Sequence, residues 1–187
     1  MCSSDLPERI VAARFEAVDQ ALRRLLPQQI ESAEIAEAVE LVREAMIGCS
    51  IAGRPLFAAH AALPWPSEPH VALWHGLNLF REHRGEGHTS AVMAARLTPE
   101  QTAPLLIAAT GEARDGRSWR WPDDVWNQAV AELQERGWLD DAGVLTDEGL
   151  AARTRIEDET DGLALGPWLQ LGKERTHRLW TDRKSVV

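Results

Sequence analysis

The sequence is poor in several residue types, and each shortage excludes a class of protein. Its two cysteines, Cys2 and Cys49, cannot form a disulfide framework or a four-thiolate zinc site. No apolar run approaches the roughly 20 residues that a membrane-spanning helix needs, and no secretory signal peptide is recognisable. We therefore expect a cytoplasmic protein that does not enter a membrane.

Lysine is nearly absent. Only Lys173 and Lys184 occur, so the 20 basic residues are almost all arginine, and the abundance of arginine and alanine favours a GC-rich, actinobacterial source. The 29 acidic residues give a formal net charge of -9, which argues against broad non-specific attraction to nucleic acid. With 187 residues, 44% of them hydrophobic, the chain can bury the core of one domain or of two small ones.

Apolar residues recur at three- and four-residue steps, which predicts a mainly α fold. A helix is expected from about Ser32 to Ile47, and Pro55 and the Thr98–Gln101 capping box mark two further helix starts. Gly85 is expected to stop the helix that starts near Ser67. Two apolar pairs at 138–139 and 144–145 flank a turn rich in Asp and Gly, which predicts one small β-hairpin.

The stretch 74–88 combines three of the six histidines with carboxylates and arginines. If the helix ends at Gly85, these side chains gather in one place. Such a cluster suits an anionic ligand or general acid–base chemistry. The alternative is a solvated helix end with surface ion pairs worth under about 1 kcal/mol each. The candidate ligand-binding residues are Trp74, His75, Asn78, Arg81, Glu82, His83, Arg84, Glu86 and His88.

No metal site and no other cofactor is predicted. His83 and His88 lack the i, i+4 spacing that places two ligands on one helical face, and no HExxH motif is present. The glycines at 85 and 87 are not followed by the third glycine of a dinucleotide-binding fingerprint.

Several motifs resemble those of known families. One stretch resembles MarR-like winged-helix proteins in the order of its elements. An expected helix is followed by Arg136-Gly137-Trp138-Leu139, a turn, Leu145-Thr146-Asp147-Glu148-Gly149 and a second helix. Other segments are similar to an actinobacterial helix-turn-helix family with members labelled SalK. These segments are Leu73-Trp74-His75, residues 79–88, Trp126 and residues 53–60. The resemblance implies a helical array with a MarR-like winged-helix unit: a helical segment over 7–66 and a winged-helix-like domain over 67–181.

The charges of the expected recognition helix do not suit DNA. Its segment 122–136 carries Asp123 and Asp124 at the start, where a major-groove helix needs Arg, Lys, Asn or Gln. The turn adds Asp140 and Asp141, which phosphate would repel. DNA binding through this helix is therefore not expected, and a regulator would need a basic surface elsewhere, such as the arginines within 114–120.

Both ends of the sequence resemble translated sequencing-adapter DNA. We expect residues 1–6 and 182–187 to be adapter-derived, which makes 7–181 a fragment truncated at both ends relative to longer members of the family.

Three functions are compatible with these features. The first is a small-molecule-binding relative of winged-helix proteins, of unknown pathway and with a possible homodimer as its assembly. The second is an enzyme with acid and base residues in the 74–88 cluster. The third is a MarR-like transcriptional regulator.

Overall fold

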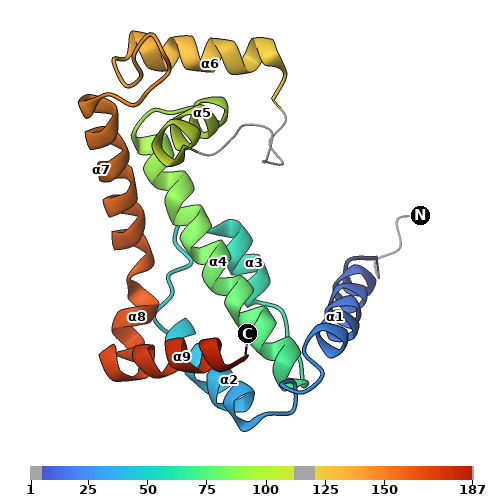
Figure 1. The fold of residues 1–187 in the computed structure, drawn as a ribbon. Coiled ribbons are helices and arrows are strands. Elements are labelled where there is room, and N and C mark those ends of the chain that lie inside the picture. Colours follow the sequence, from blue (N-terminus) through green and yellow to red (C-terminus); the bar gives the residue numbers. More distant parts are fainter. Residues whose placement is uncertain (1–5, 112–120, 187) are drawn as a thin grey trace. The chain divides into compact units, whose positions relative to one another are not determined.

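The computed structural model describes residues 6–111 and 121–186, with side chains as far as Thr181. The described residues form nine helices, coloured along the chain in Figure 1. These are α1 (Leu6–Leu25), α2 (Ala33–Met46), α3 (Pro55–Ala61), α4 (Pro69–Ala94), α5 (Pro99–Thr110), α6 (Asp123–Glu135), α7 (Asp147–Ala164), α8 (Gly166–Leu171) and α9 (Lys173–Val186).

The chain forms two compact units. The first combines residues 1–86 with 164–187, and the second comprises residues 87–163. α4 begins in the first unit and ends in the second. These units do not coincide with the segments 7–66 and 67–181 expected from the sequence, and those segments stay a prediction about domain organisation.

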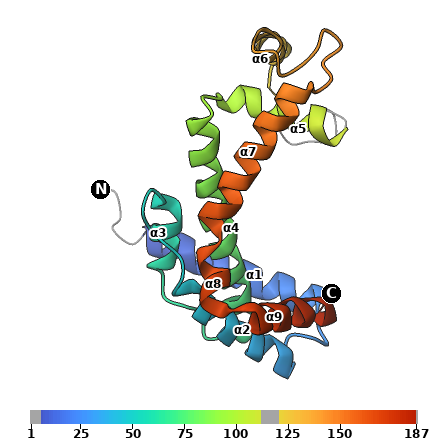
Figure 2. The same ribbon diagram turned by 90° about the vertical axis from the view of Figure 1, so that its left-hand side faces the viewer.

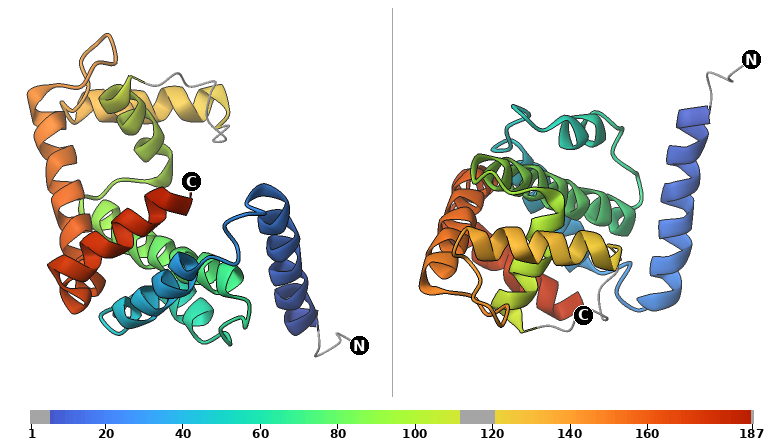
Figure 3. Two further views of the ribbon diagram at one scale, coloured as in Figure 1. Left: turned by 60° about the horizontal axis from the view of Figure 1, so that its bottom comes forward. Right: turned by 90° about the horizontal axis from the view of Figure 1, so that it is seen from above.

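The first unit is built around α2. α8 and α9 pack against it, as Figures 2 and 3 show. Val42 and Ala45 of α2 are completely buried in the cluster that also includes Leu171 and Leu179. A Cβ atom at Gly166 would lie 2.3 Å from the Gly48 carbonyl oxygen, so this close approach of α8 to the end of α2 requires glycine.

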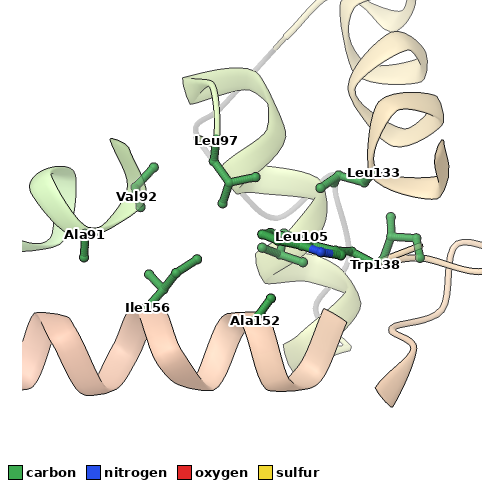
Figure 4. Close-up of a cluster of buried hydrophobic side chains, with 9 residues drawn as sticks. Ala91, Val92, Leu97, Leu105, Leu133, Trp138, Ala152 and Ile156 are labelled. Atoms are coloured by element: carbon green, nitrogen blue, oxygen red, sulfur yellow. The ribbon is translucent and has the colours of Figure 1, made fainter. Parts of the chain in front are cut away.

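The second unit has an aliphatic core around Trp138. Figure 4 shows side chains from α4, α5, α6 and α7 that converge there. Leu133 of α6 is completely buried, and α5 packs against α6. The buried members are Ala91, Val92, Leu97, Leu105, Leu133, Trp138, Leu139, Ala152 and Ile156.

Local signals at three helix starts are confirmed. The Ser32 hydroxyl accepts a hydrogen bond from the Ile35 N–H at 3.4 Å. Pro55 is the first residue of α3. The Gln101 side chain accepts from the Thr98 N–H at 3.0 Å, which completes the capping box at the start of α5. Each signal acts over a few residues, so it can be recognised without knowledge of the tertiary structure.

The β-hairpin expected at 138–145 does not form. The described residues contain no strand, and Leu139 and Leu145 make only an isolated antiparallel bridge. Asp140 Oδ1 accepts hydrogen bonds from two backbone N–H groups within the turn, at 2.9 and 2.8 Å, and such a side-chain-capped turn competes with a strand ladder. Thr146 then caps α7. The mainly α prediction is confirmed, whereas the prediction of a winged-helix unit with a β-hairpin is wrong.

The helix end expected at Gly85 is also wrong. α4 continues from Pro69 to Ala94 through Gly85 and Gly87 (Figure 1). A glycine inside a helix costs about 1 kcal/mol relative to alanine. The buried side chains on either side, such as Leu79 and Ala91, give the continuous helix tertiary contacts that outweigh this cost.

Candidate functional site

The continuity of α4 separates the side chains that the sequence was expected to bring together. Successive residues of an α-helix point about 100° apart, so the positions from 74 to 88 face several directions. In the structure, most of the nine candidate residues contact separate partners.

Trp74 and His75 face α1. The His75 ring is 2% exposed and makes edge-to-face contacts with Phe15 and Trp65, at centroid distances of 5.4 and 5.3 Å. Burial lowers the pKa of His75 to about 4, with smaller contributions from nearby cationic groups. The ring is therefore neutral at pH 7. Trp74 lies under the Arg14 guanidinium, 4.9 Å from the ring centroid.

His83 joins α4 to the segment before α3. Its Nε2 accepts a hydrogen bond from the Ser50 N–H at 3.3 Å, and its ring packs edge-to-face on Phe57. Its backbone carbonyl accepts from Arg54 Nε at 3.1 Å. Burial, followed by the charge of Arg54, lowers the pKa of His83. The residue has the contacts of a packed core histidine.

Glu86 holds the first turn of α3. Its two carboxylate oxygens accept hydrogen bonds from the backbone N–H groups of Leu56 and Phe57, at 2.9 and 2.7 Å. These N–H groups have no acceptor within the helix, because the first four N–H groups of any helix lack one. A carboxylate also matches the positive end of the helix dipole. Glu86 thus caps the N-terminus of α3, although it lies about 30 residues further along the sequence.

The remaining polar residues of the 74–86 stretch differ in exposure. Arg81 and Arg84 are exposed, whereas Glu82 is 7% exposed and makes an ion pair with Arg81. The Arg81 guanidinium also donates to Asn78 Oδ1 at 3.3 Å. The buried Nδ2 atom of Asn78 has no hydrogen-bond partner among the described residues.

His88 belongs to the second unit. Its Nδ1 lies 3.0 Å from the Thr160 hydroxyl of α7. That hydroxyl in turn donates to the Ile156 carbonyl at 2.7 Å. His88 is therefore held by α7, through a hydrogen-bond chain within residues 87–163.

A cavity of about 530 Å³ lies elsewhere in the first unit, between α1, α2, α4, α8 and α9. Trp74 is the one candidate residue from the sequence that lines it. The lining is mostly aliphatic and aromatic and comprises Leu22, Leu26, Ile35, Ala38, His70, Leu73, Trp74, Leu77, Phe80, Trp168, Thr176, Leu179 and Trp180.

Two polar side chains face this apolar cavity. His70 is 5% exposed, and its Nε2 lies 2.6 Å from Asp19 Oδ1. Hydrogen bonds from Arg23 and then His70 lower the pKa of Asp19. The Thr176 hydroxyl is buried without a hydrogen-bond partner among the described residues. Buried hydroxyl groups are normally paired, so this atom offers one unused polar contact to a molecule in the cavity.

Phe80 and Trp168 form one wall of the cavity. Their rings stack with centroids 5.0 Å apart and an interplanar angle of 23°. This site could not be recognised from local sequence patterns, because Phe80 and Trp168 are almost 90 residues apart in the chain. The tryptophans at 168 and 180, close together in a short C-terminal segment, are the signal that could have pointed to it.

The described part of the chain contains neither a metal site nor a membrane-spanning helix. Among the residues that the structure describes, no three histidine, cysteine, aspartate or glutamate side chains are grouped to hold a metal ion. In the same residues, no helix combines the length and apolar character needed to span a bilayer.

The exposed face of α6 is acidic at its start. Asp123 and Asp124 are exposed in its first turn. Half-buried Glu132 accepts a hydrogen bond from the Gln101 side chain at 2.7 Å, which ties α6 to α5. The described face therefore offers phosphate no cation near its N-terminus. The alternative basic surface, in residues 114–120, lies outside the described residues.

Comparison with known proteins gives one family. Residues 3–187 match a helix-turn-helix family, and the chain belongs to that family. No curated protein and no solved structure matches the chain. The helix-turn-helix part of the expected resemblance is thus confirmed. The likeness to SalK-labelled proteins, the actinobacterial source and the truncation stay predictions.

Proposed function

We propose that this helix-turn-helix family protein binds a small, largely apolar molecule in the cavity of its first unit. The role would be sensory or auxiliary in a pathway that the sequence does not identify. A cytoplasmic location and the narrower relation to SalK-labelled proteins belong to the same proposal.

The observation that carries the proposal is the cavity itself. Its volume of about 530 Å³ lies within the roughly 300–1,000 Å³ of typical small-molecule sites. Such sites combine an apolar and aromatic lining with a few polar groups that orient the ligand. The cavity has this composition, with Trp74, Trp168 and Trp180 as aromatic walls and Thr176 as an unpaired hydroxyl.

The lining also limits the chemistry of the ligand. A multiply charged molecule would lose its hydration on entry without gaining a paired charge, which is costly. An aromatic or alicyclic body can stack on the tryptophans, while one hydroxyl, carbonyl or amine group contacts Thr176 or the His70–Asp19 pair. We therefore expect a neutral or singly charged cyclic metabolite.

A thermal-shift experiment tests this. The full chain is melted with a panel of cyclic metabolites, and a ligand present at 100 times its Kd stabilises the native state by about 2.7 kcal/mol. For a protein of this size, that corresponds to a rise in Tm of roughly 5 to 10 °C. Leu77→Trp at the exposed edge of the cavity should reduce the shift.

Leu150→Trp is the matched control, because Leu150 is also an exposed leucine of a helix and does not line the cavity. It should leave the ligand-induced shift unchanged. Equal shifts in Leu77→Trp and the wild type would contradict the assignment of the ligand to this cavity.

DNA binding is the second candidate, favoured by membership in a helix-turn-helix family. It requires cations beyond the described face of α6. Retention on DNA that falls steeply with salt concentration, as counterion release demands, would support this candidate. Catalysis by the 74–88 residues is a separate alternative that turnover of a bound ligand would reveal.

A further inference from the structure

A second cavity, of about 600 Å³, lies within the second unit, between the end of α4, α5 and α7. We propose that it is a second, separate binding site, for a molecule with an apolar body and an N–H or O–H group that donates a hydrogen bond to His88 Nε2. This site shares no lining residue with the first cavity, so it does not depend on the function proposed above.

The orientation of the His88 ring follows from the hydrogen-bond chain behind it. The Thr160 hydroxyl lies 2.7 Å from the Ile156 carbonyl oxygen. A carbonyl oxygen can only accept, so the hydroxyl proton points to it. The same hydroxyl lies 3.0 Å from His88 Nδ1 and can then only accept from that nitrogen. The neutral ring therefore carries its proton on Nδ1.

This tautomer leaves His88 Nε2 as a hydrogen-bond acceptor. His88 lines the cavity, and with Nδ1 held by Thr160, the Nε2 edge is the part of the ring available to a ligand. A neutral imidazole has one donor and one acceptor nitrogen. Thr160 is completely buried, so its hydroxyl holds the proton of the His88 ring on Nδ1 from inside the protein. The partner of one ring nitrogen sets the tautomer of metal-ligating histidines in the same way.

The rest of the lining sets the remaining features of the ligand. Val92, Leu97, Leu105 and Ile156 provide an apolar surface for its body. Arg153 and Glu157 of α7, whose charged groups are 3.7 Å apart, also line the cavity. Because this pair carries no net charge, we expect a neutral ligand rather than an anion.

A pair of probes that differ in one hydrogen-bond donor tests the proposal. Indole has an N–H group, whereas 1-methylindole has none. Nitrogen NMR of the histidine rings in the full chain should first show His88 protonated on Nδ1. Indole should then shift the His88 Nε2 signal and bind there at least fivefold more tightly than 1-methylindole, because the analogue leaves the acceptor unpaired.

Two variants distinguish this site from the first cavity. Thr160→Val removes the hydroxyl but keeps the side-chain shape, so the His88 tautomers should mix and the preference for indole should fall below twofold. His88→Phe should abolish the preference in this cavity. The Trp138 indole signal reports whether the second unit is still folded in each variant.

Three results would overturn the proposal: a wild-type His88 protonated on Nε2, equal affinities of the two probes at His88, or an unmoved His88 signal while the tryptophans of the first cavity shift. The last result would still support the first cavity as a ligand site, so the two proposals can fail separately.

Discussion

The two compact units differ in the chemistry of their interiors. Among its described residues, the first buries five ionisable side chains, namely Arg54, His70, His75, Glu82 and His83. In the second, the buried polar residues that the structure describes are the uncharged Gln101 and Thr160, and the core is a cluster of aliphatic side chains around Trp138. Burying ionisable groups is costly unless they are paired. The first unit should therefore respond to pH, whereas the stability of the second should follow its packing.

The largest expected effect is in the core of the second unit. Leu133→Ala should lower the free energy of unfolding by about 2 to 5 kcal/mol, because Leu133 is completely buried and its truncation leaves a cavity. Urea denaturation measures this loss. Leu150→Ala, at an exposed position of the same unit, should change it by less than about 0.5 kcal/mol. Similar losses in the two variants would show that the core is misidentified.

The next effect is a pH dependence that belongs to the first unit. Because the pKa of His75 is about 4 in the folded chain and about 6.5 when unfolded, the unfolded state takes up the proton first as pH falls. Stability is therefore lost between pH 6.5 and pH 4, by about 3 kcal/mol at pH 4.

The matched variants are His75→Phe and His177→Phe. Unfolding free energies at several pH values should show a shallower acid loss in His75→Phe than in the wild type, since carboxylate titration is common to both. His177 is exposed, so its replacement should keep the wild-type slope. Identical slopes in all three proteins would contradict the burial of a neutral His75.

A smaller effect is expected for the helix cap supplied by Glu86. Glu86→Gln keeps one acceptor oxygen but loses the charge and one of the two hydrogen bonds to α3. It should cost about 1 to 2 kcal/mol of unfolding free energy. Glu31→Gln, at an exposed position, serves as the control. A Glu86→Gln chain as stable as the control would mean that α3 does not need this cap.

The smallest effect is expected at the surface of the first unit. The Arg178 guanidinium pairs with both carboxylate oxygens of Glu37, at 2.9 and 2.7 Å, and hydrogen bonding to Arg178 lowers the pKa of Glu37. Both side chains are about half exposed, and the contribution of solvent-exposed ion pairs to stability is small. Glu37→Gln should therefore change urea stability less than Glu86→Gln does, and a larger loss would show that the pair organises the packing of α9.

Sequence reasoning succeeded where the cause was local. The helix starts at Ser32, Pro55 and Thr98 were predictable because each depends on residues within one turn. It failed at Gly85, where tertiary contacts of α4 override a poor local propensity. It also failed at the 138–145 hairpin, where Asp140 closes the turn with its side chain.

The partners of the candidate residues in 74–88 were less predictable than the helices, because these contacts also depend on tertiary structure. Residue types alone suggested that His75, His83 and Glu86 act together. Their partners, such as Phe15, Ser50 and the first turn of α3, lie 29 or more residues away in the sequence. No periodicity within 74–88 encodes those contacts. Trp74 and His88, in contrast, do line cavities.

The indole N–H signals of the tryptophans test directly whether the first unit binds a ligand in its cavity. In the full chain, each signal is assigned by a single Trp→Phe variant, and an apolar ligand found by thermal shift is then titrated. The signals of Trp74, Trp168 and Trp180 should move together with one Kd, while those of Trp126 and Trp138 stay unchanged. Ligand saturation without movement of the first three signals would contradict a binding site in the first unit.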